Sequence, residues 1–267
     1  MNVTFRRIFL LFVLLQATAI SSAQTSEANI GDSLAFVEVA TLDTTKFDYD
    51  SFTILPGSGL FVRESENGEF LALDSMRCAE FKHLKFLDDI WFDQVVTSVN
   101  HIYVRNDKQV YDIGQDACSL VAEFDTASFR LFAATDTTFL FVVYQDEGSL
   151  LYQYRLSTDD VELLYATADD IYGAEQLNGS VWFVAGNTLY EINGEGVESI
   201  FTYDPESFIG MTLTRSGALV YSTTKVILFD GADAYPVASG SFFRLLNDAD
   251  RTYFILRDGE VLATDVL

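Results

Sequence analysis

The segment DIYGAEQLNGSVWFVAGNTLYEINGEGVESIFTY, residues Asp170–Tyr203, decides the fold. It consists of four short apolar runs separated by turn residues: Tyr172–Leu177, Val181–Ala185, Thr188–Ile192 and Val197–Phe201. The first two connections are Asn178-Gly179 and Gly186-Asn187, whose residues adopt positive φ at little cost and favour two-residue β-hairpin turns. The third connection, Asn193–Gly196, is longer but has the same composition. The segment therefore predicts a four-stranded antiparallel meander.

The meander is repeated further along the chain. A shift of 37 residues places Gly173 on Gly210, and Asn193-Gly194 on Asp230-Gly231, without a gap. The same shift places the apolar residues 182–184 on residues 219–221. Self-similarity at a fixed period of 20–50 residues is typical of repeat architectures. The sequence therefore predicts one structural unit used several times.

The strands are apolar on both faces, which decides the kind of repeat. Four runs have this pattern: Phe139–Tyr144, Val181–Ala185, Val226–Phe229 and Tyr253–Leu256. A strand with one face in water would alternate apolar and polar residues. Small antiparallel sheets that are covered on both faces by other sheets fit a β-propeller best. A two-sheet β-sandwich, which would leave its outward positions polar, is the second interpretation.

The rest of the chain divides into units of similar length. Units four and five are the matched pair described above. The strands expected in the other units are Phe52–Leu55, Gly59–Arg63, Glu69–Leu73 and Ala79–Leu84 in unit one; Val95–Val99, His101–Arg105, Gln109–Ile113 and Ser119–Phe124 in unit two; Leu131–Thr135, Phe139–Tyr144, Ser149–Leu156 and Val161–Tyr165 in unit three; and Phe242–Leu246, Thr252–Arg257 and Glu260–Asp265 in unit six.

The two ends of the chain predict how the ring closes. Unit six has only three expected strands, and Leu34–Thr41 reads as a strand with no hairpin partner nearby. We expect this N-terminal strand to complete the last blade, because closure removes exposed sheet edges. The prediction is an all-β propeller of about six four-stranded blades, with five or seven as alternatives. In Met76–Trp91 the apolar residues have nearly helical spacing, so a helix is an alternative there.

The first strands of successive units carry small residues at comparable places. These are Thr97, Ala133, Gly173 and Gly210. First strands are expected to lie nearest the axis, where backbones approach one another closely and glycine is favoured. Steric crowding is the first explanation for these residues, and a lined binding channel is the second.

The N-terminus predicts export. Arg6-Arg7 precede the apolar run Ile8–Leu15, and Ser21–Ala23 supplies the small residues of a cleavage site before Gln24. This is the pattern of a secretory signal peptide, and the arginine pair also fits part of a twin-arginine signal. We therefore expect a signal peptide over residues 1–23, a polar lead-in with the closing strand over 24–46, and the propeller over 47–267, in a secreted or periplasmic protein. No other run reaches membrane-spanning length.

The composition restricts the partners. The chain has 267 residues, of which 49% are hydrophobic, enough for a large core in one domain. It has 40 acidic and 16 basic residues, a net charge of −24, which becomes −26 without residues 1–23. Nucleic acid is not expected as a partner, because binding it requires cations on the phosphates. The acidity suits a soluble surface, a basic partner, diffuse cation binding or a saline habitat.

The two cysteines lie 40 residues apart, at matching places in units one and two. Cys78 and Cys118 in an exported chain suggest a disulfide. Equivalent points on neighbouring blades can, however, exceed the ~7 Å limit between Cα atoms, so both states stay open. With His83 and His101 as the only histidines, and no close Cys or His spacing, a zinc site is not expected.

No string in the sequence predicts a catalytic site. Ser222–Lys225 fits S-x-x-K but falls in a predicted hairpin turn, where serine and lysine are not one helical turn apart. Asn178–Ser180 is a glycosylation sequon, although the same residues form a turn. The acidic pairs, Asp112/Asp116, Asp159-Asp160, Asp169-Asp170 and Asp248/Asp250, also fall in predicted turns. Their spacing is not that of a calcium loop, so no cofactor is expected beyond weak surface calcium.

Two stretches carry a family resemblance. Residues 106–111 (NDKQVY), followed by 124–129 (FDTASF), resemble the DKNYY repeats of exported bacterial proteins. This resemblance covers one unit and implies no activity. The 37–40-residue units are similar to those of secreted β-propellers in general.

The leading functional hypothesis is an exported, non-catalytic propeller that binds an unknown protein or carbohydrate. The rival is an extracytoplasmic hydrolase or lyase, for example a carbohydrate-active one, that uses carboxylates at the rim of the ring. A third hypothesis is a structural subunit of an envelope assembly. Two or three inward carboxylates beside an Arg or His at one rim pocket would favour the enzyme.

Overall fold

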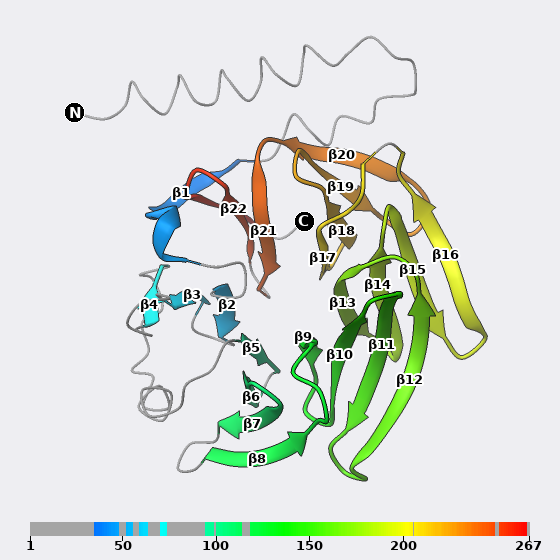
Figure 1. Cartoon of the computed structure of the whole chain (residues 1–267). Coiled ribbons are helices and arrows are strands. Elements are labelled where there is room, and N and C mark those ends of the chain that lie inside the picture. Colours follow the sequence, from blue (N-terminus) through cyan, green and yellow to red (C-terminus); the bar gives the residue numbers. More distant parts are fainter. Residues whose placement is uncertain are drawn as a thin grey trace, which may run out of the picture.

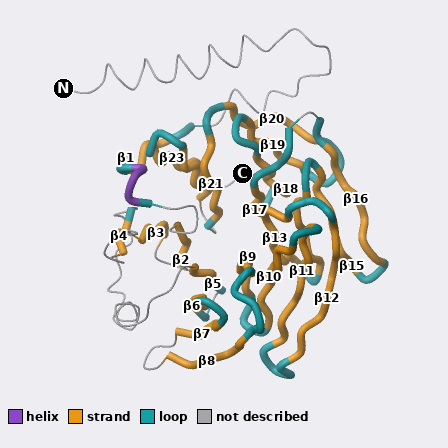
Figure 2. Tube along the Cα trace, in the orientation of Figure 1, coloured by secondary structure: helices purple, strands orange, loops and turns teal. Residues whose placement is uncertain are grey.

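The computed structural model describes residues 35–47, 52–55, 59–63, 70–73, 94–98, 100–113, 118–204, 206–248 and 251–265. Figure 2 shows that these residues form strands joined by short loops, with the short 3-10 helix η1 (Thr44–Lys46) near the start. No helix within these ranges has the length and apolar character that a membrane span requires.

The strands form six small antiparallel sheets. In blade one they are β2 (Phe52–Leu55), β3 (Gly59–Arg63) and β4 (Phe70–Ala72); in blade two β5 (Gln94–Thr97), β6 (Ile102–Asn106), β7 (Gln109–Ile113) and β8 (Cys118–Glu123); in blade three β9 (Phe129–Ala134), β10 (Thr138–Gln145), β11 (Gly148–Arg155) and β12 (Asp160–Thr167). In blade four they are β13 (Ile171–Leu177), β14 (Ser180–Ala185), β15 (Thr188–Asn193) and β16 (Gly196–Thr202); in blade five β17 (Gly210–Thr214), β18 (Gly217–Tyr221), β19 (Lys225–Phe229) and β20 (Ala234–Ser239); in blade six β21 (Phe242–Asn247), β22 (Arg251–Leu256), β23 (Glu260–Asp265) and β1 (Val37–Thr41).

Figure 1 shows these sheets arranged as blades around a central axis, with the first strand of each blade innermost. The predicted β-propeller is confirmed, and the β-sandwich is excluded because the sheets form a ring rather than two layers. In blade one the fourth predicted strand, Ala79–Leu84, and the alternative helix Met76–Trp91 lie outside the described residues.

The predicted repeat of 37 residues is confirmed by the strands and turns of blades four and five. Asn178 and Gly179 both adopt positive φ, 53° and 88°, as their turn requires. The third connection is tighter than expected, because Asn193 pairs with Gly196 and leaves a two-residue turn. The side chain of Asn193 explains this, since its Oδ1 accepts a hydrogen bond from the N–H of Glu195 at 2.9 Å.

The ring is closed by the N-terminal strand, as predicted. β1 pairs antiparallel with β23, with Val37 opposite Ala263 and Thr41 opposite Glu260. β1 thereby becomes the outermost strand of blade six, in which β21, β22 and β23 come from the other end of the described chain. The first and last parts of the fold are thus held together by one ladder of backbone hydrogen bonds.

The core is divided among the interfaces between blades. Six clusters of buried apolar side chains lie within the described residues, one for each pair of neighbouring blades. The cluster between blades two and three is the most aromatic, with Phe139 stacked on Tyr154 at 4.7 Å between ring centroids. Strands such as β10, β14 and β19 are buried on both faces because each face belongs to a different cluster.

The first strands of the blades form a closed inner ring. β2, β5, β9, β13, β17 and β21 each contact the next, and β21 contacts β2. Side chains cross between them: Gln94 Nε2 donates to the carbonyl of Leu131 at 2.7 Å, and Thr97 Oγ1 donates to the carbonyl of Ile54 at 2.7 Å. The crowding explains two small residues singled out in the sequence. A Cβ on Gly173 would lie 2.8 Å from the backbone nitrogen of Met211, and one on Gly210 would overlap the Tyr221 ring.

Gly173→Ala tests this crowding. We expect the free energy of unfolding to fall by about 1–3 kcal/mol, because the new methyl group meets backbone that cannot move aside. Urea denaturation measures the change. Gly194→Ala is the matched control in the same blade, because nothing lies within 4 Å of its added Cβ. Equal effects of the two substitutions would contradict the steric explanation.

Candidate functional site

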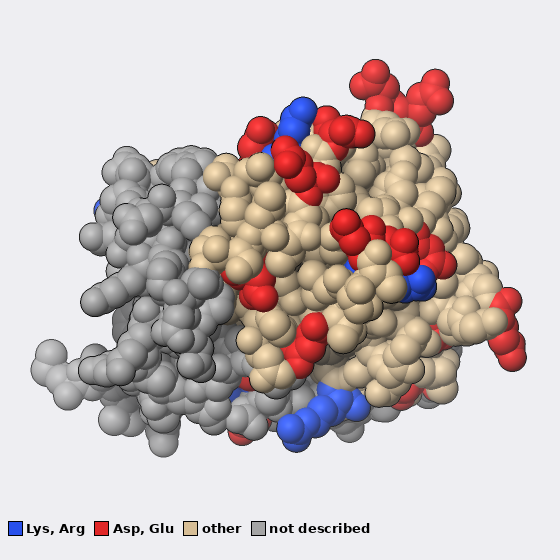
Figure 3. Space-filling model, turned by 90° about the horizontal axis from the view of Figure 1, so that it is seen from below, with Lys and Arg blue, Asp and Glu red and all other residues tan. Residues whose placement is uncertain are grey.

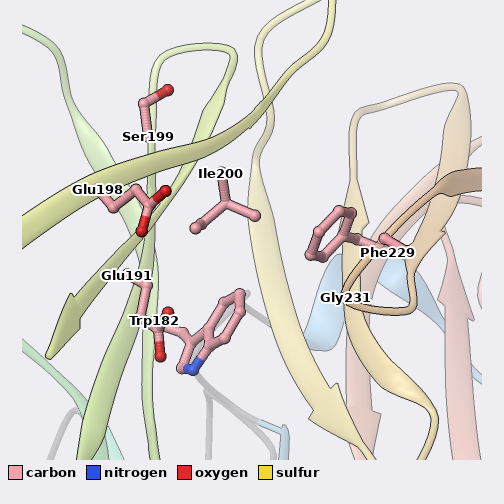
Figure 4. Close-up of a pocket in the computed structure, with 8 residues that line it drawn as sticks. Trp182, Glu191, Glu198, Ser199, Ile200, Phe229 and Gly231 are labelled. Atoms are coloured by element: carbon pink, nitrogen blue, oxygen red, sulfur yellow. The ribbon is translucent and has the colours of Figure 1, made fainter.

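A pocket of about 320 Å³ opens between blades four and five. Its walls are Trp182 on β14, Glu191 on β15, residues 198–200 on β16, Phe229 on β19, and Gly231 and Ala232 in the turn that follows. Figure 4 shows Trp182 and the glutamates on the blade-four side and the Phe229 ring facing them from blade five. Glu198, Ser199, Gly231 and Ala232 are exposed, so they form the mouth of the pocket.

The strand register places three glutamates and a tryptophan of blade four in one row. Glu175 lies opposite Trp182, Trp182 opposite Glu191, and Glu191 opposite Glu198. Residues that are directly opposite in antiparallel strands point to the same face. The row therefore crosses blade four from the axis to the outer edge, on the face turned toward blade five.

The two outer carboxylates of this row, Glu191 and Glu198, have no counter-charge among the residues that the structure describes. Among the residues lining the pocket none is Lys, Arg or His, and within the described part of the chain neither Glu191 nor Glu198 has an ion-pair or hydrogen-bond partner. Like charges directly opposite on neighbouring strands destabilise a sheet. The pair is thus an unfavourable feature of the fold in the absence of a cation.

Apart from Ser199, the other side chains that line the pocket are apolar. Trp182 and Ile200 pack against the buried cluster that also contains Phe229 and Ile227. The opposite rim is a tight turn, in which Asp230 Oδ1 accepts hydrogen bonds from the N–H groups of Ala232 and Asp233, both at 2.9 Å. Apolar walls therefore surround a pair of carboxylates at an exposed mouth.

Glu175, the innermost member of the row, has a different environment. Burial raises the pKa of its carboxyl to about 7, although the N–H of Leu213, the hydroxyl of Thr212 and the charge of Arg244 all favour the ionised form. Glu175 Oε2 accepts the Leu213 N–H at 2.8 Å, which joins β13 to β17. The residue is a link between blades near the axis rather than part of the pocket wall.

A second polar cluster lies between blades two and three. His101 Nδ1 is 2.8 Å from Asp112 Oδ2, and the imidazole stacks on Tyr103. The Tyr103 hydroxyl and Asp112 Oδ1 are buried and have no hydrogen-bond partner among the described residues. The burial of Tyr103, together with the charge of Asp112, raises the pKa of its hydroxyl. Asp136 in the next turn accepts the hydroxyl of Ser98 at 2.8 Å. Ser98 is therefore held by Asp136 and not by the imidazole.

The other residues singled out in the sequence are not brought together. Cys118 is half-buried at the start of β8 and packs toward blade one, where Cys78 is expected; Cys78 and His83 lie outside the described residues, so the disulfide stays a prediction. Burial, with the charge of Asp112, raises the pKa of the Cys118 thiol. Asn178 forms its predicted turn.

The Ser222–Lys225 string forms a turn, as predicted. Ser222 Oγ donates to Glu206 Oε2 at 2.5 Å and accepts the N–H of Lys225 at 3.1 Å, while Lys225 Nζ donates to the Tyr203 hydroxyl at 2.6 Å. The Ser222 and Lys225 side chains thus have different hydrogen-bond partners, and the turn and these contacts account for the S-x-x-K string without a catalytic role.

The acidic residues remain spread over turns and edges. No group of three or more His, Cys, Asp or Glu that could hold a metal ion occurs among the residues with described positions. Weak surface calcium therefore stays a prediction. Asp159 adopts a φ of 58° in the β11–β12 turn, which fits the turn role proposed for these acids. Figure 3 shows one side of the molecule on which acidic side chains outnumber basic ones.

Comparison with solved structures supports the fold. Virginiamycin B lyase from Staphylococcus aureus, solved as a catalytically inactive form with quinupristin, has a TM-score of 0.55 at 12% identity, over 81% of this chain and 80% of that one. TolB from Acinetobacter baumannii has a TM-score of 0.50 at 14% identity, over 77% of this chain and 59% of that one. At such identities the likeness shows the fold alone.

The sequence itself matches no family model and no curated protein. The resemblance to DKNYY repeats therefore gains no support, whereas the resemblance to β-propellers is confirmed at the level of the fold.

Glu175→Gln tests the buried carboxyl through the pH dependence of stability. The pKa of Glu175, about 7, lies above its ordinary value of 4.5, so between these values the folded state binds more protons than the unfolded state. Stability from this group then falls as pH rises. We expect the melting temperature of the variant, relative to wild type, to increase from about pH 4.5 to about pH 8. The exposed Glu147, changed to Gln, should give no such trend; a flat difference for Glu175→Gln would refute the raised pKa.

Proposed function

We propose that the protein is an exported, non-catalytic β-propeller that holds a partner in the pocket between blades four and five. The observation that carries this proposal is the facing pair Glu191 and Glu198, which lies without a counter-charge beside Trp182 in an exposed pocket. Such a pocket has no partner in the described part of the chain and offers both apolar surface and charge to one outside it.

The arrangement of the two glutamates favours binding over glycoside hydrolysis. Glycosidases place two carboxyl groups so that they flank the scissile bond. Glu191 and Glu198 project from neighbouring strands of one sheet face, so both approach an occupant from the same side. The facing wall from blade five is Phe229 with Gly231 and Ala232, which supply no acid or base.

A hydrolase or lyase remains the second candidate, and His101 is the observation that favours it. An imidazole whose Nδ1 faces a carboxylate can act as a general base through Nε2, and Asp112 provides that carboxylate. If the chain turns over a saccharide or ester, His101→Gln should abolish the turnover while Ala232→Trp should leave it unchanged.

Export is tested by the N-terminus of the mature protein. We expect protein recovered outside the cytoplasm of its own host to begin at Gln24, because Ser21–Ala23 places small residues before that bond. Intact-mass measurement and N-terminal sequencing give the answer. Recovery of the full chain from the cytoplasm alone would refute this part of the proposal.

Blocking the pocket tests the binding site independently of its chemistry. Ala232→Trp adds a large ring to an exposed turn at the mouth, and should displace whatever partner the pocket holds. Extracytoplasmic material of the host is passed over immobilised wild type and variant, and retained components are identified and quantified. A component held by wild type should be reduced at least about tenfold on the variant, as expected when contacts at the centre of an interface are lost.

Thr158→Trp is the control for this experiment. Thr158 is exposed in the β11–β12 turn, the equivalent third connection of blade three, so the variant adds the same ring away from the pocket. Equal retention by wild type and both variants would overturn the proposed site, as would product formation from a saccharide that depends on His101.

A further inference from the structure

We infer that the pocket binds the side chain of an arginine presented by a protein partner. The inference rests on the proposed function and adds the chemistry of the occupant. It follows from the charge of the pocket, from the composition of its walls and from the surface around its mouth.

The charge of the pocket favours a cation as its occupant. Glu191 and Glu198 lie directly opposite each other, and among the described residues that line the pocket none is basic. A neutral sugar would leave the repulsion between the two carboxylates in place, whereas a cation between them interacts favourably with both. The net charge of −24 over the whole chain also raises the concentration of basic partners near the surface.

The walls favour a guanidinium group over a simple ammonium. A planar guanidinium donates along two edges, so it can reach two neighbouring carboxylates at once, and it stacks on aromatic faces. Trp182 is the neighbour of Glu191 in the row and supplies an indole ring, the strongest cation–π partner. Ile200 and Phe229 supply the apolar surface against which the aliphatic part of an arginine packs.

The surface around the mouth favours a protein as the source of the arginine. β16 is the outer edge strand of its sheet, and Glu198 and Ser199 on this strand are exposed, as are Gly231 and Ala232 in the facing turn. A mouth that opens along an exposed strand edge suits an interface, in which an arginine anchor is surrounded by contacts that exclude water. A small free amine or guanidine would leave this surface uncovered.

Indole resonances provide the test. The chain has two tryptophans, Trp91 and Trp182, so a ¹⁵N-labelled sample gives two indole N–H signals, and Trp182→Phe assigns them. The probe is an acetylated, amidated pentapeptide with one arginine between glycine pairs; the same peptide with citrulline, the same peptide with lysine, and a neutral trisaccharide are compared. We expect the arginine peptide to shift the Trp182 signal saturably, and citrulline, which is neutral and nearly isosteric, to leave it in place.

The charge requirement is tested with isosteric variants. Glu191→Gln with Glu198→Gln should weaken the arginine peptide at least about tenfold, because hydrogen bonds between charged groups are the strong ones. Asp146→Asn with Glu147→Gln removes the same charge from the exposed β10–β11 turn and should leave the affinity within about twofold, as expected for exposed charges screened by salt.

Three results would overturn the inference: equal shifts by citrulline and arginine peptides, a shift by the trisaccharide alone, or equal losses in both double variants. None of these results contradicts the proposed function, because that function is tested separately by the steric block in Ala232→Trp. A partner lost on Ala232→Trp but retained by the Glu191/Glu198 double variant would keep the binding site and refute the arginine.

Discussion

The structure depends on strands that are apolar on both faces. Such a strand is stable only if another layer covers each side, and burying one Phe or Leu side chain contributes about 1.5–3 kcal/mol. Because every blade has two apolar faces, an open row of blades would leave one apolar face exposed at each end. Both are covered only when the last blade packs against the first. The six buried clusters, one for each pair of neighbours, are the result. The pairing of β1 with β23 is then the step that fixes the number of blades, since it completes blade six with a strand from the far end of the chain.

The same geometry explains why one interface holds both a buried carboxyl and an open pocket. Blades are closest at the inner ring and diverge outward (Figure 1). Near the axis between blades four and five, Gly173 leaves no room for a methyl group beside Met211, and Glu175 reaches the backbone of Leu213 directly. Farther out, Trp182 and Ile200 pack toward Phe229, and the pocket between the two blades is lined at its exposed mouth by Gly231 and Ala232. Glu175 and Glu198 therefore lie on the same sheet face, but the carboxyl of Glu175 is buried and that of Glu198 is exposed to solvent.

Much of this architecture can be predicted from sequence. The two-residue turns at Asn178-Gly179 and Gly186-Asn187 fix the register of β13, β14 and β15, so the row Glu175–Trp182–Glu191 follows from the turns by pairing outward from each one. A search for acidic residues that are neighbours along the chain misses this row, because its members are neighbours only across strands. The placement of Phe229 against the row cannot be predicted, because the distance between neighbouring blades depends on the volumes of all the side chains packed between them. The raised pKa of Glu175 depends on the same packing. Residues 1–34, and the region of Cys78, bear on export and on the disulfide but lie outside the described structure.

The repeat supplies a comparison within the molecule that bears on function. A shift of 37 residues carries the row of blade four onto Thr212, Leu219, Leu228 and Tyr235 of blade five, and these residues are also directly opposite one another. There the row is part of the core, with Leu219 and Leu228 buried. The fold therefore accepts an uncharged row at this place. Three carboxylates with a tryptophan are the less stable choice, since facing like charges and a buried carboxyl both oppose folding. Positions at which a sequence departs from what its fold favours are expected to be functional. The departure in this row lies on the face of blade four that lines the pocket.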